Sequence, residues 1–164
     1  MSRKTCCGMC VVVLGVGCLL LPLSAADEDK PYLLSVKEIK VAEADDELVK
    51  LQKQRYNAAA RDLQARMALY NTGESTLDPL FAAGRRILRA DLALAGDLDK
   101  KVQAHARMLE LAKFLEERAS VQFGSGVTTV ADLELARYHR IDAEIGLLKA
   151  KRAAKLAASR VDGL

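Results

Sequence analysis

One segment occurs twice in this chain, and this repeat constrains the fold more than any other feature of the sequence. Residues 66–95 align with residues 119–148 at an offset of 53, the separation of Gly73 from Gly126. In each copy an aromatic residue is followed three residues on by glycine, three further on by threonine, and then by an alanine-rich run of helical periodicity. Glycine adopts positive φ at a helix end without steric cost, and threonine can accept hydrogen bonds from the first free N–H groups of the next helix. Each copy therefore predicts the tip of a helical hairpin.

The positions that the two copies share fall into two groups. The tip residues, where we expect a protein partner to bind, are Tyr70, Gly73, Thr76, Phe123, Gly126 and Thr129. The seam residues, which we expect to pack against other helices, are Leu80, Ala83, Ala90, Leu94, Leu133, Ala136, Ala143 and Leu147. No identical pair falls on a position expected to face solvent. The repeat thus preserves a hairpin and its packing face rather than a surface chemistry.

Apolar periodicity predicts four helices, over residues 36–71, 76–95, about 97 to the second tip, and 129–161. Gly96 is interpreted as a helix stop followed by an aspartate cap, and a continuous bent helix is the alternative. If the chain reverses there, the fold class is all-α, with two long helical hairpins in an antiparallel up-down-up-down coiled-coil or four-helix arrangement. Both tips then lie at the same end.

The first 26 residues have the pattern of a secretory signal peptide. Two basic residues near the start precede an apolar run over residues 11–23, and small residues lead to a predicted cleavage between Ala26 and Asp27. We therefore expect an exported protein, periplasmic or associated with the outer membrane. Lipoprotein processing at Cys18 remains an alternative. All four cysteines precede the cleavage position, so the mature chain has no disulfide and no thiol chemistry.

The mature chain is expected to form one domain. Residues 27–35 are predicted to be a flexible lead-in, and residues 36–160 a helical domain whose two hairpin repeats span about 36–96 and 97–160. Removing the two basic residues of the signal leaves 23 basic and 22 acidic residues, a net charge of +1. This balance gives no basic surface of the kind that binds nucleic acid.

The sequence contains no recognisable catalytic, cofactor-binding or metal-binding motif, so we predict that the chain is not an enzyme. His105 and His139 lie on different predicted helices, and packed or solvated histidines are the simpler interpretation. The acidic cluster Glu43, Asp45, Asp46 and Glu47 is interpreted as the solvated face of a helix. Arg140 stands in the seam, where we expect it to extend to the edge or to pair with an acid of another helix.

The repeat resembles the helical repeat of the TolC-like outer-membrane efflux proteins. The residues that carry the resemblance are Tyr70, Gly73, Thr76, Leu77, Asp78, Leu80, Ala83, Leu88, Ala90, Leu92 to Ala95 and, in the second copy, Phe123, Gly126, Thr129, Leu133, Ala136, Ile141, Ala143 and Leu147. In that family two such tips per protomer form the periplasmic end of a trimeric tunnel and meet an adaptor protein. This chain has no segment with the alternation of a barrel strand, so it resembles the hairpin module alone.

The resemblance implies a helical-hairpin envelope protein that contributes to an efflux or transport assembly. Its expected partner is a protein of the cell envelope, such as an efflux adaptor or channel component, and self-association through the seams would make a homo-oligomer. The alternative is a freestanding periplasmic four-helix bundle with a structural or ligand-binding role.

Overall fold

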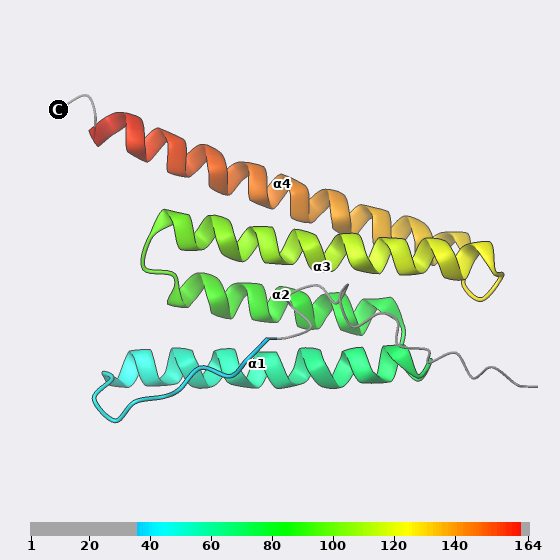
Figure 1. The fold of residues 1–164 in the computed structure, drawn as a ribbon, viewed down its shortest axis with the longest axis horizontal. Helices are drawn as coiled ribbons and strands as arrows, with labels where there is room; N and C mark the ends of the chain where they lie inside the picture. Colours follow the sequence, from blue (N-terminus) through cyan, green and yellow to red (C-terminus); the bar gives the residue numbers. More distant parts are fainter. Residues whose placement is uncertain (1–35, 162–164) are drawn as a thin grey trace, which may run out of the picture.

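The computed structural model describes residues 36–161 and has four helices, with no strand in that range. They lie side by side in chain order, each antiparallel to the next (Figure 1). Their bounds are α1 (Glu47–Asn71), α2 (Leu77–Leu94), α3 (Leu98–Gly124) and α4 (Val130–Val161). The predicted all-α, up-down-up-down class is confirmed, and the chain reverses at Gly96. The predicted signal peptide, the lead-in at 27–35 and the alternative at Cys18 lie outside the described residues.

The four helices form an open row. Neighbouring helices pack together, α2 also touches α4, and α1 makes no close backbone contact with α3 or α4 in the described range. The buried side chains nevertheless form one continuous core, whose largest fully buried members are Phe81, Leu63, Leu80, Ile87, Leu111 and Leu115. None of the described helices is apolar over a long enough stretch to cross a membrane.

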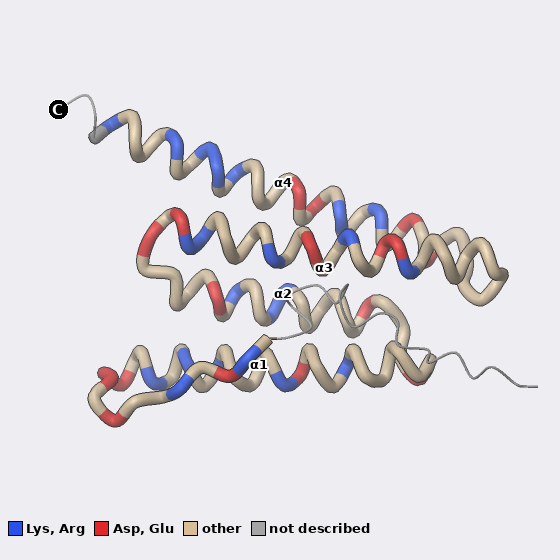
Figure 2. The backbone as a smooth tube through the Cα atoms, in the orientation of Figure 1, with Lys and Arg blue, Asp and Glu red and all other residues tan. Residues whose placement is uncertain are grey.

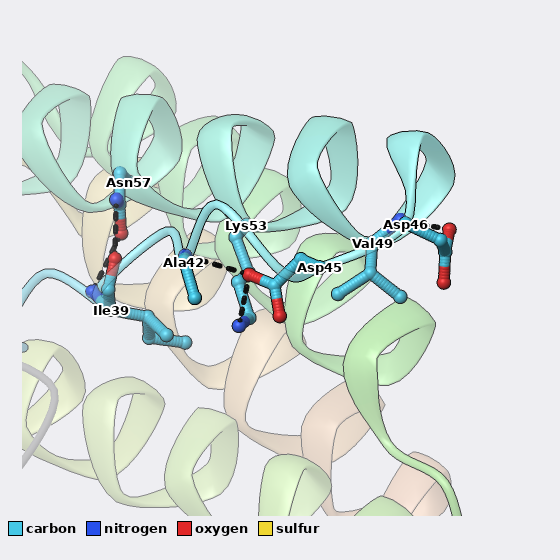
Figure 3. Close-up of polar contacts among 7 residues, drawn as sticks. All are labelled: Ile39, Ala42, Asp45, Asp46, Val49, Lys53 and Asn57. Atoms are coloured by element: carbon cyan, nitrogen blue, oxygen red, sulfur yellow. Dashed lines mark hydrogen bonds and ion pairs between the residues drawn. The ribbon is translucent and has the colours of Figure 1, made fainter.

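Helix α1 begins eleven residues later than predicted, because two short carboxylates bind the backbone locally. Asp45 Oδ2 accepts a hydrogen bond from the Ala42 amide at 2.8 Å and closes a turn, and Asp46 Oδ1 accepts one from the Val49 amide at 3.0 Å as the N-cap (Figure 3). Such side chains compete with helical hydrogen bonding inside a helix and favour its start. The prediction of a helix from Val36, with these acids on a solvated helical face, is therefore wrong.

Residues 36–46, called the strap here, run back alongside α1 instead of extending it. The amide of Asn57 binds both backbone groups of Ile39, accepting from its N–H at 2.8 Å and donating to its carbonyl at 2.9 Å (Figure 3). Gln64 Nε2 donates to the Val36 carbonyl at 2.7 Å, and the side chain of Val36 is buried in the core. The strap is thus fixed to α1 by side chains that lie 18 and 28 residues further along the chain.

The middle and last pairs of helices are joined by close approach and by ion pairs. Gly84 of α2 faces α3 so closely that a Cβ there would lie 2.9 Å from Leu111 Cδ2. The α3–α4 pair carries an ion pair between Arg140 Nε and Glu116 Oε2 at 2.7 Å. Arg140 therefore pairs with an acid of another helix, one of the two outcomes expected for it.

The charges of α4 are segregated along its length. From Lys149 to Arg160 every charged residue is basic, whereas its acids all lie in the N-terminal half (Figure 2). The basic half reaches the end of the molecule opposite the two tips (Figure 1).

Candidate functional site

The two hairpin tips have the same backbone hydrogen bonds. In the first tip the amide of Gly73 donates to the Tyr70 carbonyl, and that of Glu74 to the Leu69 carbonyl at 2.8 Å. Fifty-three residues later, Gly126 donates to Phe123 and Val127 donates to Gln122 at 2.8 Å. Gly73 and Gly126 have φ of 77° and 74°, the left-handed conformation that ends a helix in a Schellman motif. The repeat therefore encodes one turn geometry twice.

Both tips lie at the same end of the row (Figure 1) and are joined by side chains. Tyr70 Oη donates to Gln122 Oε1 at 3.1 Å, and Arg118 Nη1 donates to Asn71 Oδ1 at 2.5 Å. The Arg118 guanidinium also lies over the Tyr70 ring, 5.6 Å from its centre. These contacts connect the end of α1 to the end of α3 across the row.

The two tips differ in what they expose. Tyr70 is 7% exposed and faces the chain's own core, whereas Phe123 is 44% exposed. Of the two predicted aromatic anchors, only Phe123 is thus available to a partner. The apolar tip, as we name it, comprises Val121, Phe123, Val127 and Val130, all exposed.

The threonines of the two tips also differ. Thr129 and Asp132 form a reciprocal capping box at the start of α4: the Asp132 amide donates to Thr129 Oγ1, and the Thr129 amide donates to Asp132 Oδ2, both at 3.2 Å. Hydrogen bonds from Thr129 and Thr128 lower the pKa of Asp132. Thr76 occupies the N-cap position of α2, but its side chain makes no capping hydrogen bond. Thr76 therefore stands at the expected N-cap position, but its hydroxyl does not make the expected capping hydrogen bond.

The seam residues face the inside of the molecule. Seven of the eight are buried, and Leu94 is half-buried at the end of α2. Since these residues already pack within the chain, a second copy could reach them only if the helices separated. The seam residues therefore serve packing within one chain, and oligomerisation through them would require the helices to separate first.

The structure brings the only two histidines of the sequence to one hollow of about 180 Å³ between α2, α3 and α4. The ring of His139 lies 4.0 Å from that of Phe81, and its Nδ1 lies 3.5 Å from Arg85 Nη1. Burial lowers the pKa of both imidazoles, and Arg85 lowers that of His139 further. Both shifts favour the neutral form of the imidazole rings. No group of three or more His, Cys, Asp or Glu residues with metal-binding geometry occurs among residues 36–161.

Sequence reasoning missed this juxtaposition, although one signal for it exists. His139 lies three residues after Ala136 and four before Ala143, which is the spacing of the buried face of α4. A histidine on that face must pack against another helix, but the residue opposite it depends on the register of α2 and α3.

A second hollow, of about 490 Å³, opens between α1 and α2. We call it the arginine cleft; it is lined by Arg55, Ala58, Ala59, Asp62, Arg66, Arg86, Arg89 and Ala90. Asp62 accepts from Arg66 Nε at 2.8 Å and from Arg86 Nη2 at 2.6 Å. Burial by itself would raise the pKa of Asp62, but these hydrogen bonds outweigh it and lower the pKa. Of these lining residues only Ala90 was singled out from the sequence, as a packing residue of the seam.

Comparisons with protein-family models, with curated proteins and with solved structures give no match to this chain. Inferences about its function therefore depend on the geometry above and on the resemblance of the repeat.

Proposed function

We propose that the chain is an exported helical-hairpin module of the cell envelope that binds a protein partner through its two-tip end. The observation that carries the proposal is the pairing of the tips: two hairpins with one turn geometry end side by side, joined by Tyr70 and Gln122. The contacts between the tips place the apolar tip beside the first hairpin. Exposed apolar side chains gathered at one place are typical of an interaction surface.

The resemblance to TolC-like efflux proteins supports a partner class. In that family the corresponding tips meet an adaptor, so the partner proposed here is an adaptor or channel component of an efflux assembly. The contribution of this chain would be a hairpin pair, with the membrane-spanning part supplied by another protein.

Site-specific photocrosslinking tests the proposal in intact envelopes. A photoreactive residue at Phe123 or Val127 should crosslink to an adaptor or channel component identified by mass spectrometry. The matched control position is Leu156, which is 62% exposed and lies in the basic half of α4. Equal crosslinking from the control position, or no adaptor or channel component among the products, would contradict the proposal and favour the freestanding bundle.

A second variant separates loss of binding from loss of folding. Val127→Ser changes a side chain that is 74% exposed, so the melting temperature should not change. Crosslinking from Phe123 should nevertheless decrease, because the substitution places a hydroxyl on the apolar tip. Unchanged crosslinking in this variant would exclude the apolar tip as the contact surface.

A further inference from the structure

The arginine cleft contains more positive charge than the packing of α1 against α2 requires. Four guanidinium groups face one carboxylate, a formal charge of +3. Asp62 binds two of them, Arg66 of its own helix and Arg86 of α2. Arg55 and Arg89 line the same hollow, and within residues 36–161 neither forms an ion pair or a hydrogen bond with another side chain. Arg55 and Arg89 therefore add positive charge to the cleft, but within the described residues they form no ion pair that links α1 to α2.

The floor of the cleft is apolar and small. Ala58, Ala59 and Ala90 line the cleft together with the arginines; Ala59 and Ala90 are buried and Ala58 is exposed. Alanines at these positions leave the hollow open, since longer side chains would fill it. Its volume of about 490 Å³ is within the range of small-molecule sites.

We infer that the arginine cleft binds a small molecule carrying a phosphate group, with the alanine floor against its apolar part. The guanidinium fork matches phosphate oxygens through paired hydrogen bonds, and several forks converging from two helices favour a multiply charged anion. Asp62 positions Arg66 and Arg86, and Arg55 and Arg89 supply unpaired donors. The phosphate can belong to a free organic phosphate or to a lipid headgroup. The site is separate from the two tips and does not depend on the proposed partner.

Calorimetric titration with pyrophosphate and with dodecyl phosphate tests the free-molecule source. Wild-type protein should bind both saturably at concentrations below about 1 mM, with dodecyl phosphate bound more tightly because of the alanine floor. The double variant Arg55→Gln/Arg89→Gln should weaken binding at least about tenfold, since it removes both unpaired forks. Its melting temperature should not change, because neither side chain holds the fold.

The matched control is Arg152→Gln/Arg160→Gln, which removes the same charge from the basic half of α4. This variant should keep wild-type affinity. Equal loss in both double variants would show non-specific attraction and overturn the inference, as would the absence of saturable binding in the wild type.

Flotation with phosphatidylglycerol vesicles, compared with phosphatidylcholine vesicles, separates the two sources of the phosphate. If the Arg55→Gln/Arg89→Gln variant no longer associates with the phosphatidylglycerol vesicles, the ligand is a lipid headgroup. If its association with the vesicles is unchanged and the titration is positive, the ligand is a free organic phosphate.

Discussion

The phenolic hydroxyl of Tyr70, at the end of α1, donates a hydrogen bond to the side-chain oxygen of Gln122, near the end of α3, over 3.1 Å. The two helices make no close backbone contact in the described range, so side chains provide this connection. Together with the contacts of Arg118 to Asn71 and to the Tyr70 ring, this hydrogen bond links one hairpin tip to the other.

Replacing Tyr70 by phenylalanine should lower the free energy of unfolding by about 1 kcal/mol, because the ring stays buried while the hydrogen bond is lost. Burial raises the pKa of Tyr70 above its ordinary value of 10.0, so its contribution to stability is present below that pH and is lost as pH rises through the folded-state pKa. Urea unfolding at neutral and alkaline pH measures both effects. The exposed Tyr138→Phe is the control, and the same alkaline loss in wild type and Tyr70→Phe would contradict the prediction.

The two threonine caps should respond differently to truncation. Thr129→Ala should destabilise the protein by about 1 kcal/mol because it breaks the capping box with Asp132. Thr76→Ala should have a much smaller effect, since the Thr76 side chain makes no capping hydrogen bond. Thermal unfolding of both variants measures the difference. Equal losses would show that the threonines act through something other than their hydroxyls.

The tip glycines should be intolerant of a side chain for conformational reasons alone. A Cβ at Gly73 or Gly126 would meet no atom within 4 Å, yet both residues have positive φ. Gly73→Ala and Gly126→Ala should each cost about 1 kcal/mol through backbone strain. Gly96 is the control, because it also has open space but no positive φ. A loss at Gly96→Ala as large as at the tips would contradict this account.

The strap should detach when Asn57 is removed. Asn57→Ala leaves the N–H and carbonyl of Ile39 without their partner, at a cost of about 1–3 kcal/mol if the groups stay buried. The strap should then become accessible to trypsin at Lys37 and Lys40, which limited proteolysis with mass spectrometry detects. The nearby exposed Gln54→Ala should leave cleavage unchanged. Unaltered protection in Asn57→Ala would show that the strap is held mainly by other contacts.

The two histidines should make the protein less stable in mildly acidic solution. Burial lowers the pKa of His105 and His139 below the ordinary 6.5, so the stability gained from the neutral rings is present above that pH and is lost as pH falls through the folded-state pKa. The double variant His105→Gln/His139→Gln should show a smaller change in melting temperature between pH 7.5 and about pH 5.5. An identical change in wild type and variant would contradict the prediction.

Much of the hairpin architecture could be predicted because its signals are local. The positive φ of Gly73 and Gly126 follows from a glycine between two helical runs, and the Thr129–Asp132 cap from residues three apart. The beginning of α1 could not be predicted in this way. The seven-residue series Ala42, Val49, Tyr56, Leu63 and Tyr70 begins before α1 does. The strap is instead held by Asn57, whose contact with Ile39 spans 18 residues.

The amino-acid sequence by itself determined the helices after the first tip, the two Schellman turns and the buried seam, because hydrophobic periodicity and capping act within a few residues. Only the tertiary structure decided which aromatic side chain is covered, and which charged or ring-bearing residues share a hollow. Tyr70 is buried at the end of α1, where side chains of α3 contact it, whereas Phe123 at the end of α3 is exposed. Arg55 and Arg89 line one hollow because α1 and α2 pack together in one register. Such juxtapositions depend on packing between helices, which the pattern within one helix does not specify.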